Sequence, residues 1–110
     1  MILITGPLWS GKRDFACRLL GCGREKLAAR AVWDAQELAA GCDDLEALAE
    51  RLAGKEVVIL TEVGGGVVPT DPQVRRDREA AGRLGCLLAA RASCVVRVFC
   101  GLPLVLKGEL

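Results

Sequence analysis

The sequence predicts an α/β fold in which helices flank a mostly parallel sheet of about four to five strands, in three layers. Short apolar or β-branched runs alternate with segments of helical periodicity about four times along the chain. The run at residues 57–60 is apolar at every position, which is typical of a strand covered on both faces. The 110 residues fit a single domain, and we expect it to span residues 1–110.

The first fifteen residues contain the pattern around which the rest of the chain is arranged. An apolar strand at residues 2–5 is followed by Gly6, four further residues, Gly11 and Lys12, and then a helical pattern. Strand, Gly-x4-Gly-Lys and helix in this order are typical of a phosphate-binding loop (P-loop). Glycines let backbone N–H groups converge on phosphate oxygens, the helix directs its positive end at them, and the lysine reaches the terminal phosphates.

The alternative is a chance spacing of two glycines and a lysine, but the position of the motif between a strand and a helix favours a P-loop NTPase-like domain. The expected ligand is a nucleoside triphosphate, ATP or GTP. One residue departs from the pattern: Arg13 stands where a Ser or Thr hydroxyl normally binds Mg²⁺, which puts the magnesium ion in doubt. The predicted nucleotide-binding residues are Gly6, Pro7, Leu8, Trp9, Ser10, Gly11, Lys12 and Arg13.

Two acidic residues follow predicted strands. Asp34 comes after a short strand at residues 31–33, and Glu62 comes after the strand at 57–60. Because ligands of open parallel sheets bind beyond the carboxyl ends of the strands, both acids are expected to face the same crevice as the P-loop. Lys12, Asp34 and Glu62 are therefore the candidate catalytic residues, and the two acids are the candidate magnesium ligands. For Asp34, a surface turn remains an equal alternative.

The remaining elements follow from caps and periodicity. Asp43 and Asp44 precede a helical pattern, and Asp71 with Pro72 predicts the start of a long helix that runs to about residue 92. Its arginines at 75, 76 and 78 form either a solvated face or a phosphate contact. The glycines at 64–66 are either a simple turn or part of the crevice. A strand at 94–100 and a short edge strand at 104–107 complete the sheet.

Composition excludes several functions. The net charge is +1 with both signs interspersed, so no global field favours nucleic acid or an anionic membrane. No apolar run approaches the ~20 residues of a membrane span, and we expect a cytoplasmic protein. Histidine is absent, which excludes imidazole acid–base chemistry and a phosphorylated or nucleotidylated histidine. The six cysteines contain no Cys-x-x-Cys pair, so reduced thiols in the core are favoured over a zinc site.

Several stretches resemble the cobinamide kinase/cobinamide-phosphate guanylyltransferase family of cobalamin biosynthesis. Residues 1–6 with 10–12 resemble its first strand and P-loop, and residues 62–69 resemble its Asn-Glu-Val-Gly-x-Gly-Ile-Val-Pro segment. Residues 82–83 and 101–104, with Lys107, resemble its C-terminal helix, strand and tail. The register runs without a gap from Val57 to Lys107, about half of the chain. The resemblance implies cobinamide kinase activity on the aminopropanol hydroxyl, a corrinoid partner and a homo-oligomer.

The departures from the family pattern bear on activity. Family members are longer between the first helix and about Trp33, where the resemblance places the histidine that accepts the guanylyl group. The guanylyltransferase step is therefore not expected here. Thr61 replaces the family's Asn, and Arg13 replaces the hydroxyl residue of the P-loop. Two functions stay open: a shortened cobinamide kinase, or a non-catalytic homologue that binds nucleotide or another subunit.

Overall fold

A computed structural model describes residues 1–63 and 70–110. The predictions made for the glycines at 64–66 and for residues 67–69 fall outside this part of the chain. In chain order, the elements are β1 (Ile2–Gly6), α1 (Lys12–Leu20), α2 (Arg24–Leu27), β2 (Ala31–Val32), the 3-10 helix η1 (Ala35–Ala39), α3 (Leu45–Leu52), β3 (Val57–Thr61), α4 (Pro72–Arg91), β4 (Cys94–Phe99) and β5 (Leu102–Lys107).

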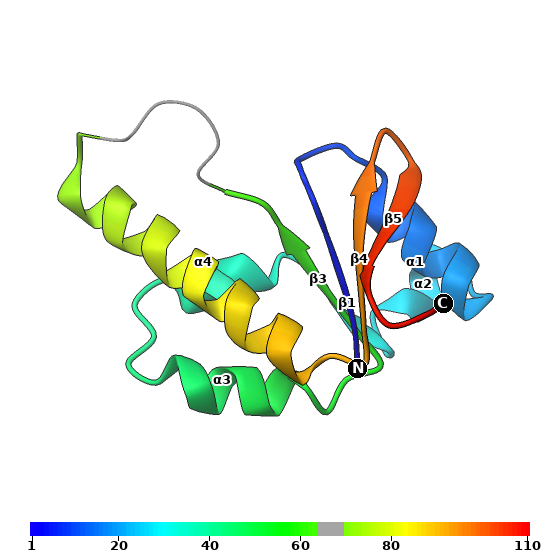
Figure 1. The fold of residues 1–110 in the computed structure, drawn as a ribbon, viewed down its shortest axis with the longest axis horizontal. Helices are drawn as coiled ribbons and strands as arrows, with labels where there is room; N and C mark the ends of the chain where they lie inside the picture. The colour runs from blue at the N-terminus through cyan, green and yellow to red at the C-terminus, as the bar shows by residue number, and fades with distance from the viewer. Residues whose placement is uncertain (64–69) are drawn as a thin grey trace.

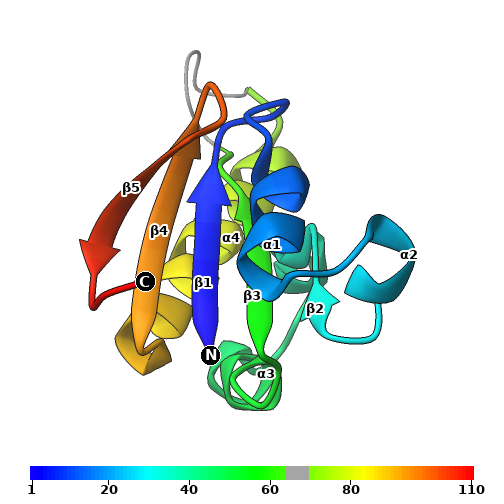
Figure 2. The same ribbon diagram turned by 90° about the vertical axis from the view of Figure 1, so that its right-hand side faces the viewer.

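The five strands form one sheet in the order β2-β3-β1-β4-β5 (Figure 1, with all five strands labelled in Figure 2). Strands β1 to β4 run parallel, and β5 returns antiparallel to β4 along the edge. Figure 2 shows α1 and α2 on one face of the sheet and α3 and α4 on the other. The predicted α/β fold with a mostly parallel, helix-flanked sheet is confirmed.

Alternating side chains divide the core between the two faces of the sheet. Leu3 and Val58 pack with η1, α3 and α4, whereas their neighbours Ile4 and Ile59 pack against α1 and α2. Both faces of β3 are buried, as its continuous apolar run predicts. Full burial of each such Leu, Ile or Val side chain contributes about 1.5–3 kcal/mol. Two separate apolar clusters therefore hold the central strands rigidly between two layers of helices.

The predicted helix starts at Asp44 and Asp71 are confirmed. The Asp44 side chain accepts a hydrogen bond from the Ala47 N–H (3.1 Å), and Asp71 accepts from the Gln73 N–H (2.8 Å). In the sequence, Val74 lies at helical spacing from Ala81 and is expected on the same core-facing side, yet Ala81 is buried and Val74 is 45% exposed. Figure 1 shows the reason, because the first turns of α4 extend beyond the sheet. The short helix η1 was not predicted, since five residues are too few for a periodic signal.

The carboxyl ends of the four parallel strands lie along one edge, as the sequence predicts. Ile4 of β1 is paired with Ile59 of β3 and Val96 of β4, so the following residues emerge together. Among the described helices, none is both long enough and apolar enough to cross a membrane. This carboxyl edge positions the candidate site.

Candidate functional site

The loop between β1 and α1 is held against the turn that joins β4 to β5. The Gly101 N–H donates to the Ser10 carbonyl (2.8 Å), and a Cβ on Gly6 would collide with the Val98 carbonyl oxygen. Gly11 adopts φ 91°, which L-residues rarely do, and leads directly into α1. Glycine is therefore required at both glycine positions of the motif, because the backbone of Val98 lies close to Gly6 and because Gly11 makes a left-handed turn.

Lys12 folds back over this loop and is almost completely buried, with 7% of its surface exposed. Its Nζ donates to the Pro7 carbonyl (2.6 Å) and to Ser10 Oγ (3.4 Å). Burial lowers the pKa of Lys12 from its usual value, while the charges of Asp34 and Glu62 act in the opposite direction. Within residues 1–63 and 70–110, this partly desolvated cation is hydrogen-bonded only to neutral oxygens, so it is well prepared to bind an anion.

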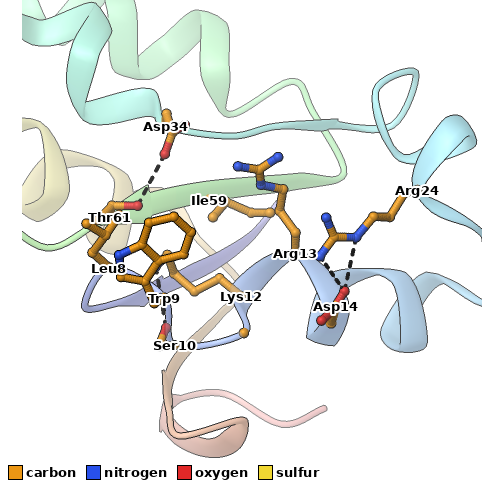
Figure 3. Close-up of a pocket in the computed structure, with 11 residues that line it drawn as sticks. Leu8, Trp9, Ser10, Lys12, Arg13, Asp14, Arg24, Asp34, Ile59 and Thr61 are labelled. Atoms are coloured by element: carbon orange, nitrogen blue, oxygen red, sulfur yellow. Dashed lines mark hydrogen bonds and ion pairs between the residues drawn. The ribbon is translucent and has the colours of Figure 1, made fainter.

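A pocket of about 320 Å³ opens over the loop and the first turn of α1 (Figure 3). The residues from the loop and α1 meet others from β3, from the end of β2 and from α2. Asp14 and Arg24 form an ion pair at its edge, with Arg24 Nη2 2.6 Å from Asp14 Oδ1. The lining residues are Leu8, Trp9, Ser10, Gly11, Lys12, Arg13, Asp14, Arg24, Asp34, Ile59 and Thr61.

Arg13 lies over an aromatic ring at the end of β2. Its guanidinium carbon is 5.4 Å from the centre of the Trp33 ring, within the range of a cation–π contact. Trp33 therefore holds the Arg13 charge beside the pocket, where the positive charge also lowers the pKa of Lys12. Sequence reasoning placed Arg13 in the site but gave no signal for its contact with Trp33.

Asp34 is linked to the end of β3. Thr61 Oγ1 donates to Asp34 Oδ1 (3.2 Å), and the Thr61 N–H donates to Gln36 Oε1 (2.9 Å). Thr61 is 6% exposed, so these contacts fix a buried hydroxyl on the floor of the pocket. The structure thus brings Asp34 into the same pocket as Lys12. The sequence did not single out Gln36, and it named Thr61 only as a replacement for the family's Asn.

Glu62 forms an ion pair with Arg97 of β4. Arg97 donates through Nε to Glu62 Oε2 (2.8 Å) and through Nη2 to Oε1 (2.9 Å), and this pairing lowers the pKa of Glu62. Arg97 also lies 5.6 Å from the Phe99 ring centre. Sequence reasoning missed Arg97, although it is the one charged residue in an otherwise apolar strand and could have been recognised on that ground.

The described residues do not assemble the magnesium site of an intact P-loop. Arg13 occupies the hydroxyl position, and Ser10 Oγ accepts a hydrogen bond from Lys12. Within residues 1–63 and 70–110, no three Asp, Glu, Cys or His side chains gather closely enough to hold a metal ion. The magnesium role of Asp34 and Glu62 stays a prediction, and no chemical step below passes through a metal.

Comparison with known proteins places the chain in a family. Residues 24–106 match the family described as cobinamide kinase / cobinamide phosphate guanyltransferase. The chain belongs to this family. It is 35% identical over 79 residues to a bifunctional adenosylcobalamin biosynthesis protein, CobU, of Salmonella typhimurium, a match covering 68% of this chain and 44% of that protein. A similar protein of Pseudomonas aeruginosa, CobP, is 42% identical over 65 residues, covering 59% of this chain and 37% of that protein.

These matches span less than half of either relative. The family match also begins at residue 24, after the P-loop and the whole of α1. The assignment of residues 6–13 to phosphate binding therefore depends on their own sequence and geometry, independently of the match that identifies the family.

Proposed function

We propose that this chain is a cytoplasmic phosphotransferase of cobalamin biosynthesis. It binds ATP or GTP in the loop at residues 6–13 and transfers the terminal phosphoryl group to the aminopropanol hydroxyl of cobinamide. The observation that carries the proposal is the buried Lys12, folded over a glycine-bounded loop at the carboxyl edge of a parallel sheet. Membership of a family described by cobinamide kinase activity supports the acceptor.

The proposed transfer uses charge and position. The acceptor oxygen forms a bond to the terminal phosphorus as the bond to the bridging oxygen breaks, which releases a nucleoside diphosphate. Lys12 stabilises negative charge on the transferred group. Asp34 accepts the hydroxyl proton, because it shares the pocket with Lys12 and Thr61 fixes it there through a 3.2 Å hydrogen bond.

Glu62 has a smaller part in this proposal. Its carboxylate already accepts two hydrogen bonds from Arg97, so it contributes negative charge near Lys12 rather than an available base. The guanylyl step is proposed to be absent, because the chain has no histidine to attack the α-phosphate. Treatment with GTP is therefore expected to leave no guanylylated protein.

A second candidate function is nucleotide binding without catalysis, as a subunit of a larger assembly. The contacts of Arg13 favour it, since a guanidinium cannot bind a cation and Trp33 holds it beside the pocket. The exposed edge strand β5 also favours it, because Leu102, Leu104 and Leu106 are each more than half exposed and offer a surface for a second subunit.

Transfer of labelled phosphate from ATP or GTP to cobinamide distinguishes the kinase from the non-catalytic nucleotide-binding subunit. The kinase predicts labelled cobinamide phosphate with the wild type and at least about a hundredfold less with Asp34→Asn, which keeps the size but loses the base. Asp43→Asn is the matched control, because Asp43 lies outside the pocket. Nucleotide binding without any transfer would favour the second candidate, and absence of nucleotide binding would reject both.

A further inference from the structure

The loop that holds Lys12 also presents two large apolar side chains. Trp9 is 92% exposed and Leu8 is 63% exposed, and both line the pocket. Figure 3 shows them toward Thr61, whereas Arg13, Asp14 and Arg24 are drawn toward the other end of the pocket. The pocket therefore has an apolar end at Leu8 and Trp9 and a charged end at α1 and α2.

Neither the solvent exposure of the Trp9 side chain nor the backbone conformation of Trp9 stabilises the fold. The residue adopts φ 63°, which residues other than Gly, Asn and Asp rarely do. Its indole does not belong to either apolar core cluster. An unfavourable backbone conformation that carries a solvent-exposed tryptophan at the edge of a pocket points to a ligand.

The direction in which a bound triphosphate would run indicates which ligand lies next to Leu8 and Trp9. In a P-loop, the backbone N–H groups hold the inner phosphates and the lysine reaches the outer ones. The nucleoside then lies toward the charged end, beyond the first turn of α1, and the terminal phosphate lies near Lys12. An acceptor in line with the breaking bond has to approach from the opposite side. That side is the apolar end formed by Leu8 and Trp9.

We propose that Leu8 and Trp9 bind the ring of the phosphate acceptor, an inference that rests on the proposed function. A corrinoid is a large, partly conjugated macrocycle edged with amide groups. The indole face offers apolar area to the ring, and the indole N–H offers a donor to an amide carbonyl. The side chains of this pair determine acceptor affinity. The loop holds the phosphates of the nucleotide through backbone N–H groups, which a side-chain replacement keeps, so nucleotide affinity is unchanged.

Equilibrium dialysis of cobinamide without nucleotide tests the inference directly. Trp9→Ala is expected to raise the Kd for cobinamide about tenfold or more, and Trp9→Phe is expected to keep it within about threefold of the wild type. The Kd for ATP or GTP, measured separately, is expected to change less than about twofold. Leu38→Ala serves as the control, because Leu38 is also exposed (48%) but lies outside the pocket.

Four results would overturn the inference. They are an unchanged cobinamide Kd in Trp9→Ala, an equal loss in Leu38→Ala, a loss confined to nucleotide binding, and a wild type that binds no cobinamide. If Trp9→Ala lost nucleotide binding alone, the indole would contact the base of the nucleotide and not the acceptor. The proposed function fails separately, if the wild type binds cobinamide but no nucleotide. Thermal unfolding followed by circular dichroism confirms that each variant is folded.

Discussion

The P-loop and the strand ends that face it use their polar groups differently. In the loop, Lys12 is bonded to a backbone carbonyl and a neutral hydroxyl. At the strand ends, the Glu62 carboxylate is paired with Arg97, and Asp34 accepts a hydrogen bond from Thr61. Among the described residues, the cation of the loop thus has no charged partner in hydrogen-bond contact, whereas the acids that would hold a metal or accept a proton are hydrogen-bonded to other groups. This difference predicts strong phosphate binding and weak dependence on a metal.

Replacement of Lys12 tests the loop side of this comparison and has the largest expected effect. Lys12→Ala removes the charge-assisted contact with a phosphate and is expected to cost roughly 1.5–3 kcal/mol, or about ten- to a hundredfold in affinity for ATP or GTP. Calorimetric titration of both proteins with ATP or GTP measures this loss of affinity. The matched control is Lys55→Ala, since Lys55 is exposed and precedes β3 at the opposite edge of the sheet. Equal binding by Lys12→Ala and the wild type would make the loop purely structural.

A methyl group on Gly6 tests whether the backbone of the loop is as constrained as its contacts indicate. Gly6→Ala forces a Cβ against the Val98 carbonyl and is expected to lower stability by about 1–3 kcal/mol. Gly82→Ala, in an open part of α4 where a Cβ meets no neighbour within 4 Å, is expected to raise stability by up to about 1 kcal/mol. Chemical denaturation of both variants measures the contrast, and a neutral Gly6→Ala would show that β1 and β4 are less closely packed here.

Arg13 lies between the two regions, and its replacement sharpens the comparison. In Arg13→Ser the guanidinium is lost and the magnesium-binding hydroxyl of the usual P-loop is restored. Addition of Mg²⁺ is expected to increase the nucleotide affinity of this variant about tenfold. The same addition is expected to increase the nucleotide affinity of the wild type by about threefold or less. Arg18→Ser is the control, because Arg18 is an exposed arginine of the same helix. The same magnesium response in Arg13→Ser and the wild type would contradict the proposed role of Arg13.

The pair of Arg97 and Glu62 gives the smallest effect, because both side chains are more than a third exposed. Arg97 lowers the pKa of Glu62 below its ordinary value of 4.5, so the pair stabilises the protein above that pH and the contribution is lost as the pH falls through the lowered value. Arg97→Met is expected to lower stability by less than about 1 kcal/mol at pH 7. The difference from the wild type should shrink below about pH 4.5 in melts across a pH series. If the stability difference between Arg97→Met and the wild type did not depend on pH, it would come from the lost contact between Arg97 and Phe99.

Much of the fold could be predicted because its signals are local. A continuous apolar run predicted β3, and a largely apolar run predicted β4. The side chains of Asp44 and Asp71 predicted where α3 and α4 begin. The order of strands in the sheet could not be predicted, since it depends on which helix covers which face. The exposure of Val74 was missed for the same reason, because periodicity does not show where a helix leaves the sheet.

The site was predictable to a different extent. The spacing of Gly6, Gly11 and Lys12 predicted a loop at the carboxyl edge, and the pocket brings Asp34 to it. The contacts of Arg13 with Trp33 and of Glu62 with Arg97 could not be predicted, because each joins residues from different strands or helices whose side-chain directions depend on packing. The roles of these residues in binding and catalysis stay predictions for the experiments above.

The most direct test of the account is the magnesium dependence of nucleotide binding by the wild-type chain. Titration with ATP and GTP, once with excess Mg²⁺ and once with EDTA, isolates the contribution of the metal from that of Lys12 and Arg13. We expect binding under both conditions, with dissociation constants within about threefold of each other. Binding that requires Mg²⁺ would contradict the account, because the loop would then depend on a cation that Arg13 is proposed to replace.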